Sequence, residues 1–349
     1  MTSLERVEAA VAGGTHPSGK KLDRVPISLL SFQNAARHAG ISVAEYCQNP
    51  EKLAAAQIGY WEEFRHDLID IENGIAAMAE AVGCTVDYAE NDAPWIVKPA
   101  ISSLEEVDRL QDVDLGTTPA VGALIEATRI VAQTLGSEVC VRGEADQGPF
   151  DLACEIVGTE QFLMALFDPG LTGAVRKLLT YAQRQVEKLI LAQKAAGTRY
   201  TMIGESFAGP DVCSPALYKK YAFPFEKSLV GRMKEQGIGV GIHICGNATA
   251  IIEDMVATGA PYFELDYKID RPAVAAAVRG KTAVFGTVDP SGVLTLGTHE
   301  EIRQAVKSDL ELFAPDKRFV LAPGCTLPYS APFENIHTFV EAGREFGVY

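Results

Sequence analysis

Three residues in the last third of the chain have side chains that zinc prefers as ligands. His243 and Cys245 lie two positions apart in the run Gly-Ile-His-Ile-Cys-Gly, and Cys325 follows a Pro-Gly pair much later in the chain. Two thiolates and one imidazole form a soft ligand set that favours Zn²⁺, and three protein ligands leave one position open, as in catalytic sites. Taken singly, such residues are more often a buried histidine and inert thiols. The prediction therefore depends on the fold bringing them together.

The spacing of the three residues relative to predicted strands indicates that they do converge. Residues two apart on a strand face the same way, so His243 and Cys245 are expected to point to one side of a strand at residues 240–245. Cys325 comes just after another β-rich run at 319–323. In a barrel the carboxyl ends of all strands form one rim, where active sites lie. The sequence thus predicts a zinc site at this rim.

Eight β-rich runs, most of them followed by longer helical patterns, predict an α/β protein folded as a (β/α)₈ TIM barrel. The expected strands are residues 25–32, 67–73, 138–144, 200–206, 240–245, 262–267, 283–288 and 319–323. The clearest expected helices are residues 248–258, 272–279 and 298–313, the second of them preceded by Asp270 or Arg271 as its cap. No Gly-x-Gly-x-x-Gly follows an early strand, which disfavours an open dinucleotide-binding sheet.

The stretch between the second and third expected strands is too long for one crossover. We expect an insertion at about 75–137, with a hairpin over 84–100 and a helix over 103–110 begun by a Ser103-x-x-Glu106 capping box. Such insertions usually lie over a barrel mouth. With a helical extension at about 1–22, the whole chain, 1–349, is predicted to be a single barrel domain, since α/β barrels reach this length.

Polar side chains follow most of the predicted strands and are expected to line the same rim. Glu264 and Asp266 share a face of the strand next to that of His243, so either carboxylate could reach the metal. The simpler role for most rim residues is a solvated loop side chain or a helix cap, and for Asp266 also an ion pair with Arg271. The catalytic candidates are Asp266, Glu264, Asp289 and Glu144, and the substrate-binding candidates are Gln33, Asn34, Asn73 and Glu205.

The composition is that of a globular protein, with 47% hydrophobic and 22% charged residues. A net charge of −15 disfavours nucleic acid and anionic membranes as partners, because phosphate binding requires clustered Lys and Arg. No apolar run reaches the length of about 20 residues that spans a bilayer, and the first residues lack a signal-peptide pattern, so we expect a cytoplasmic protein. Seven scattered cysteines, an odd number, do not suggest a disulfide framework.

Taken together, these motifs resemble those of the uroporphyrinogen decarboxylase superfamily, and within it those of the zinc-dependent cobamide methyltransferases. That branch includes the methylcobamide:coenzyme M methyltransferases and the methyltransferase I components of corrinoid-linked O-demethylases. The resemblance covers nearly the whole chain and is carried by residues 5–7, 23–26, 148–153, 214–218, 243–246, 286–290, 324–328 and 332–336. It implies a barrel whose zinc ligands match His243, Cys245 and Cys325, with Asp266 or Glu264 completing the coordination as in some members.

The resemblance further implies a zinc-dependent methyltransferase. The methyl group would move between a corrinoid (methylcobalamin or cob(I)alamin) and a small substrate, either a thiol similar to coenzyme M or a methyl ether. A separate corrinoid-binding protein would carry the corrinoid, because no cobalamin domain fits in this length, and the enzyme could be a homodimer.

Two alternatives remain open: a metal-free decarboxylase of the same fold, and a non-catalytic, zinc-stabilised binding protein. Uroporphyrinogen decarboxylases carry an Arg-rich motif after the first strand that grips substrate carboxylates. Residues 31–40 lack it here, which favours methyl transfer.

Overall fold

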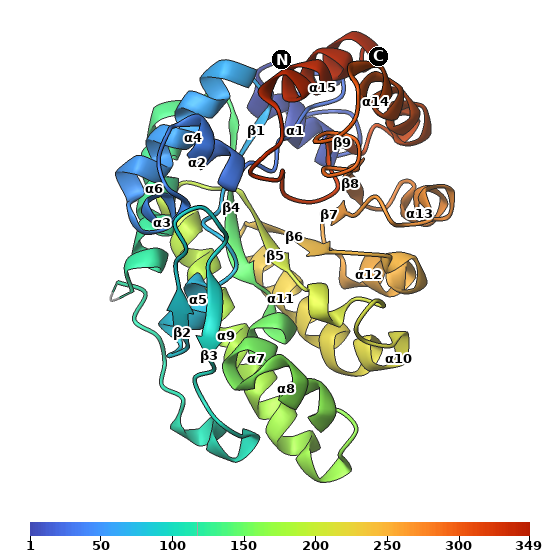
Figure 1. The fold of residues 1–349 in the computed structure, drawn as a ribbon. Helices are drawn as coiled ribbons and strands as arrows, with labels where there is room; N and C mark the ends of the chain where they lie inside the picture. Colours follow the sequence, from blue (N-terminus) through green and yellow to red (C-terminus); the bar gives the residue numbers. More distant parts are fainter. Residues whose placement is uncertain (117) are drawn as a thin grey trace.

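The computed structural model describes residues 1–116 and 118–349 and shows helices arranged around a curled parallel sheet (Figure 1). Within these residues the sheet has seven strands in the order β1-β4-β5-β6-β7-β8-β9. Nearly every strand residue is buried, as expected when helices cover a parallel sheet. The strands are β1 (Leu68–Ile71), β4 (Cys140–Gln147), β5 (Tyr200–Gly204), β6 (Gly239–Ile244), β7 (Tyr262–Leu265), β8 (Ala283–Val288) and β9 (Phe319–Pro323).

A short irregular segment near the N-terminus joins the two edges of the sheet. Ile27 forms a parallel bridge with Leu321 of β9, and Ser28 forms one with Leu68 of β1. The expectation of a regular first strand at 25–32 is therefore wrong, because the segment makes only single bridges. A proline within the segment lacks the backbone N–H that a continuous ladder needs. The other seven predicted strands are confirmed, with ends shifted by up to three residues.

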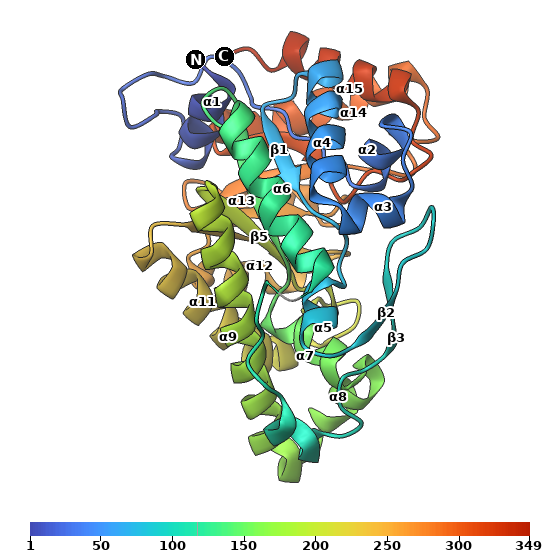
Figure 2. The ribbon, with the colours of Figure 1, turned by 90° about the vertical axis from the view of Figure 1, so that its left-hand side faces the viewer.

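Helices follow most strands and form the outer layer of the molecule, with the two chain ends close together (Figures 1 and 2). The helices are α1 (Ser3–Val11), α2 (Gln33–His38), α3 (Val43–Gln48), α4 (Pro50–Phe64), α5 (Ala77–Ala81), α6 (Pro119–Leu135), α7 (Pro149–Val157), α8 (Thr159–Ala165), α9 (Thr172–Ala196), α10 (Pro215–Leu217), α11 (Phe223–Glu235), α12 (Ile252–Thr258), α13 (Arg271–Val278), α14 (His299–Phe313) and α15 (Phe333–Phe346). In the described part of the chain, no helix is long and apolar enough to cross a membrane.

The helices expected over 272–279 and 298–313 are confirmed as α13 and α14, and their caps follow the expected chemistry. The Asp270 side chain accepts from the amide of Ala273 at the start of α13, and Thr298 begins α14 with a capping box. The expected helix over 248–258 is split, because a 3₁₀ turn at Ala248–Ile251 precedes α12. The N-terminal extension contributes α1, which packs against β4 and β9.

The insertion contains the expected hairpin, formed by the antiparallel strands β2 (Thr85–Asp87) and β3 (Trp95–Lys98). It lies along α5 and beside α8 (Figure 2). The helix expected over 103–110 is instead a 3₁₀ turn, Leu104–Arg109. The proposed cap is also wrong, because Glu106 accepts from the backbone N–H and hydroxyl of Ser102, each at 2.7 Å, rather than from Ser103.

A buried ion-pair network crosses the interior of the sheet. Arg142 of β4 is fully buried and donates from Nε to the carboxylate of Asp70 on β1 at 2.7 Å. Its Nη1 donates to the carboxylate of Glu264 on β7. Buried charges are tolerated only when they are paired in this way. The network therefore ties β4 to two strands that do not neighbour each other, and one of them lies beside the strand that bears His243.

Candidate metal centre

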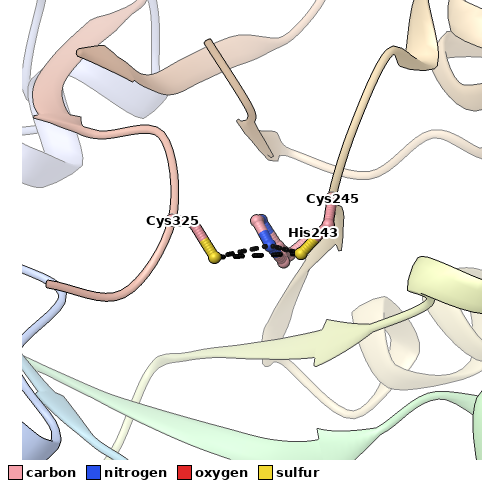
Figure 3. A group of neighbouring side chains, drawn as sticks. All are labelled: His243, Cys245 and Cys325. Atoms are coloured by element: carbon pink, nitrogen blue, oxygen red, sulfur yellow. Dashed lines mark hydrogen bonds between the residues drawn. The ribbon is translucent and has the colours of Figure 1, made fainter. Parts of the chain in front are cut away.

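His243, Cys245 and Cys325 converge at the carboxyl ends of β6 and β9 (Figure 3). His243 Nε2 lies 3.1 Å from Cys245 Sγ, the two sulfurs are 3.8 Å apart, and Cys325 Sγ is 3.8 Å from His243 Nε2. Ligand atoms of a tetrahedral zinc ion lie about 3.5–3.8 Å from one another, given bonds of 2.0–2.3 Å. The donor set suits zinc, and the two 3.8 Å separations to Cys325 Sγ match this spacing, while the 3.1 Å between His243 Nε2 and Cys245 Sγ is shorter. The fold brings together the three residues that the sequence singled out.

Two glycines allow the ligands to approach one another. Gly246, directly after Cys245, has a φ of 83°, a conformation that only glycine adopts without strain. A Cβ on Gly324 would lie 2.7 Å from the backbone nitrogen of Tyr267, which is too close for any other residue. The chain can thus pass close to the β7–α13 loop and carry Cys325 to the centre only because position 324 has no side chain.

The second ring nitrogen of His243 is held by the backbone. Nδ1 lies 3.2 Å from the carbonyl oxygen of Glu264, which can only accept a hydrogen bond. Nδ1 must therefore carry a proton, and in the neutral ring the lone pair is on Nε2, facing the two sulfurs. Metal-binding histidines usually have such a partner, because it fixes both tautomer and ring orientation. The amide of Cys245 donates to the Ser206 hydroxyl at 3.3 Å, which anchors the neighbouring ligand.

The electrostatics of the centre concentrate negative charge on one sulfur. A hydrogen bond from Cys325 and the nearby imidazole of His243 lower the pKa of Cys245 to about 3, against the opposing effect of burial. Burial lowers the pKa of His243, but the Cys245 thiolate outweighs it and raises that pKa to about 9. The hydrogen bond to Cys245, together with burial, raises the pKa of Cys325. A thiolate facing an imidazole and a second thiol is an environment that favours a soft cation.

The two carboxylates expected near the metal are both engaged by other groups. Asp266 is buried and accepts from the amides of Gly246 at 2.7 Å and Lys268 at 3.1 Å, so both its oxygens are bonded to backbone. The alternative expectation, an ion pair between Asp266 and Arg271, is wrong because Arg271 pairs with Asp309. The Glu264 side chain belongs to the network around Arg142. The backbone carbonyl of Glu264, by contrast, bonds to His243 Nδ1.

Two further candidates at the rim hold loops. Asn34 donates to the carbonyls of Pro328, Tyr329 and Ala331, at 3.1–3.3 Å, and so fixes the segment that follows Cys325. Asp289 accepts from the amides of the two residues after Pro290, each at 2.9 Å, and closes the turn after β8. A direct substrate or catalytic role for either residue remains a prediction.

Three more substrate-binding candidates lie on other elements of the rim. Gln33 donates to Asp92 of the hairpin at 3.3 Å. Asn73 donates to two buried carbonyls, at 2.9 and 2.8 Å, next to α3 and α6. Glu205 is buried and accepts from the first amides of α7, at 3.1 and 2.9 Å. None of these bonds reaches the centre itself, so their contact with a substrate stays a prediction.

The fourth catalytic candidate, Glu144, lies in a cluster of buried acids that the sequence did not reveal. Ligand oxygens of Asp70, Glu72 and Glu144 lie within 4.8 Å of one another. Burial, followed by the charge of Glu72, raises the pKa of Glu144. Asp70, Glu72 and Arg142 were not among the site candidates from the sequence, although Arg142 lies two positions before Glu144 on the same strand, β4. Period-two spacing of charges in a buried strand was the available signal.

The buried acids predict that the protein loses stability as the pH rises. Three buried carboxyls have a pKa raised to about 7, and burial is the largest cause in each: Glu72, Asp146 and Asp151. A carboxyl whose pKa is raised in the folded state contributes stability below its unfolded pKa, which is lost as the pH rises through the folded value. The free energy of unfolding should therefore fall between about pH 4 and pH 8. Urea denaturation at pH 5 and pH 8 measures this change.

The Asp146→Asn variant is the matched control for this prediction. Asp146 has a φ of 60°, which asparagine also adopts, so the substitution removes one titrating group with little backbone strain. Its urea midpoint should depend less on pH than that of the parent chain. A parent midpoint that stays constant or rises from pH 5 to pH 8 would contradict the prediction.

The fold and the centre together define a class of protein: a parallel α/β protein with a candidate His-Cys-Cys metal centre at the carboxyl ends of its strands. The chain belongs to the uroporphyrinogen decarboxylase (URO-D) family, whose model matches residues 16–346. The resemblance inferred from the motifs is therefore confirmed.

Relatives in this family have names that point to two activities. The methylcobamide:CoM methyltransferase MtbA of Methanosarcina acetivorans is 27% identical over 302 residues, covering 85% of each chain. A uroporphyrinogen decarboxylase of Prochlorococcus marinus (strain MIT 9313) is 26% identical over 345 residues, covering 93% of this chain and 94% of its own. A solved structure described as a methyltransferase from Methanosarcina mazei has a TM-score of 0.88 at 22% identity and covers 99% of both chains. It supports the fold, and overall identity does not separate the two activities.

Proposed function

We propose that this chain is a zinc-dependent enzyme that transfers a methyl group between a corrinoid and a small substrate. The observation that carries the proposal is the convergence of His243 Nε2, Cys245 Sγ and Cys325 Sγ within 4.8 Å. We interpret the seven strands and the bridging segment at Ile27 and Ser28 as a closed (β/α)₈ barrel that presents this centre at its rim. Similarity to methylcobamide:CoM methyltransferases supports the same reaction class.

Zinc, when bound, would supply a positive centre with an open position for a substrate thiolate or ether oxygen. The chain itself supplies two anionic donors, Cys245 and Cys325, which balance the charge of the cation. It also supplies one neutral donor, His243, oriented by the Glu264 carbonyl. His243 is buried, while both cysteines are partly exposed, so a substrate can reach the centre from the side of the sulfurs.

We propose that Asp266 acts mainly as a positioning residue. Its Oδ2 accepts the amide hydrogen of Gly246, the residue directly after Cys245, and its Oδ1 accepts from Lys268. This fixes the backbone at the point where β6 ends. These two hydrogen bonds use two of the four lone-pair directions of the carboxylate, so they do not exclude a direct bond from Asp266 to the metal.

The corrinoid is proposed to be carried by a separate corrinoid-binding protein. The names of the methylcobamide:CoM methyltransferases, with which the chain aligns over most of its length, support a methylated corrinoid as the reaction partner. The decarboxylase alternative is less favoured. A substrate with many carboxylates would approach a chain of net charge −15. It would also meet the buried acids Glu72 and Glu144 in the interior.

Removal of the metal tests the proposal. Chelation should abolish methyl transfer between methylcobalamin and a thiol or methyl ether, followed in the corrinoid spectrum, while far-UV circular dichroism stays unchanged. The physical reason is that a domain of this size has a core large enough to fold without metal. Added zinc should restore the transfer. Activity that resists chelation would favour the metal-free decarboxylase, and cooperative unfolding on chelation would indicate a structural zinc.

A further inference from the structure

The two cysteines of the candidate metal centre are more accessible than the other cysteines of the chain. Cys245 and Cys325 are partly exposed. The remaining cysteines are buried free thiols: Cys47, Cys84, Cys140, Cys154 and Cys213. A small oxidant attacks a sulfur that it can reach, and buried structural thiols are inert. Oxidation is therefore expected first at the centre.

The two sulfurs of the centre are also close enough to bond to each other after a small movement (Figure 3). They are 3.8 Å apart. A disulfide bond measures about 2.05 Å, so the sulfurs must approach by less than about 2 Å. Cys245 follows the last residue of β6, and Cys325 comes two positions after the end of β9. Because both residues lie outside the strands, their sulfurs can approach without a change in the sheet.

The surroundings of the pair suit the formation of a disulfide. Cys245 Sγ shares a hydrogen bond with Cys325 Sγ, and His243 Nε2 lies 3.1 Å from the same Cys245 sulfur. Cysteines that sense oxidants typically combine accessibility with a second, resolving cysteine beside them. The geometry thus offers one sulfur for the reaction with an oxidant and a second sulfur for the bond that follows.

We propose that Cys245 and Cys325 form a reversible disulfide when a peroxide reaches the centre, and that this modification releases the bound zinc. A disulfide removes both anionic donors, because metal binding requires thiolates. Of the three converging donors, only His243 would remain. The inference rests on the zinc centre of the proposed function and adds a way to switch that centre off.

The reaction consumes one molecule of hydrogen peroxide and two electrons from the pair of sulfurs. In the first step the Cys245 sulfur attacks a peroxide oxygen, an S–O bond forms, the O–O bond breaks, and the departing hydroxide takes a proton from solvent. In the second step the Cys325 sulfur attacks the Cys245 sulfur, the S–S bond forms and the S–O bond breaks. The departing hydroxide takes the thiol proton of Cys325, or a solvent proton when that sulfur was bound to zinc. The peroxide is thereby reduced to two water molecules, and a dithiol can reverse the modification by exchange.

Mass spectrometry and zinc release test the inference. Hydrogen peroxide should lower the intact mass of zinc-free protein by two hydrogen atoms, and peptide mapping should show Cys245 linked to Cys325. In zinc-loaded protein the same treatment should release about one zinc ion per chain, measured with a chromophoric chelator. Dithiothreitol followed by added zinc should restore the bound metal.

Cys154→Ala is the matched control, because Cys154 is a buried thiol outside the centre. This variant should form the same cross-link as the parent. Cys325→Ala should form none and should instead gain oxygen at Cys245. Thermal melting curves show whether both variants are folded. The inference is overturned if the parent mass does not change, if the link involves another cysteine, if both sulfurs gain oxygen without a link, or if zinc stays bound after the link forms.

The cross-link is measured in zinc-free protein, so its formation does not depend on methyl transfer. A cross-link between Cys245 and Cys325 in a protein without zinc-dependent turnover would support the cysteine pair and count against the proposed function. Zinc-dependent turnover that survives peroxide treatment, with no cross-link, would leave the proposed function intact and remove this inference.

Discussion

Replacing Cys245 and Cys325 together with alanine is expected to reduce bound zinc from about one ion per chain to almost none. Methyl transfer should fall at least about a thousandfold, because a bound cation contributes several kcal/mol of charge stabilisation and each 1.36 kcal/mol is tenfold in rate. The variant keeps one of the three converging donors, His243, which cannot hold the ion alone. Metal analysis of the purified protein and corrinoid spectroscopy measure the two effects.

Cys47→Ala is the matched control for this prediction. Cys47 is a buried free thiol on α3 and is not among the residues that converge at the centre. Its loss should leave both zinc content and methyl transfer near those of the parent. Stoichiometric zinc in the Cys245→Ala, Cys325→Ala double variant would show that the ion binds elsewhere, and the proposed function would then lose its main support.

The three candidate metal ligands could be predicted from the sequence, because both their chemistry and their positions on strands indicate one shared metal site. The alternation His243-Ile244-Cys245 fixes the direction of two side chains as soon as the strand is recognised. Cys325 follows from a barrel-like arrangement, which brings distant strand ends to one rim. The orientation of the imidazole could not be predicted, because it depends on a carbonyl of the neighbouring strand, that of Glu264.

The roles of the acids were harder to predict, because a carboxylate has the same appearance in a sequence whether it binds a metal, a backbone amide or an arginine. Asp266 and Glu264 lie on the expected face, yet one binds amides and the other binds Arg142. The pairing of Glu264 with Arg142 depends on the distance from β4 to β7 across the interior. The pattern of residues within one strand does not give that distance. The irregular segment at 25–32 was predicted wrongly for a related reason. Its apolar pattern suits a strand, but its backbone pairing is set by the two edge strands, β1 and β9, which lie far away in the sequence.

The interior network leads to the second large effect. Arg142→Met is expected to lower the free energy of unfolding by about 3–5 kcal/mol, because it leaves the carboxylates of Asp70 and Glu264 buried without their cation. Arg199→Ala is the control. Arg199 pairs with Glu8 at the surface and is 66% exposed, so its loss should cost no more than about 1 kcal/mol. Urea denaturation at pH 7 gives both values.

The dependence of this cost on pH separates lost charge pairing from lost packing. Burial already raises the pKa of Glu264, with Arg142 opposing it, so removal of the arginine should raise that pKa further. A carboxyl with a raised folded-state pKa contributes stability at low pH that disappears as the pH rises. The cost of Arg142→Met should therefore be smaller at pH 5 than at pH 7. An equal cost at both values would mean that the methionine fails to fill the space between β1, β4 and β7, and that unpaired charge is not the cause.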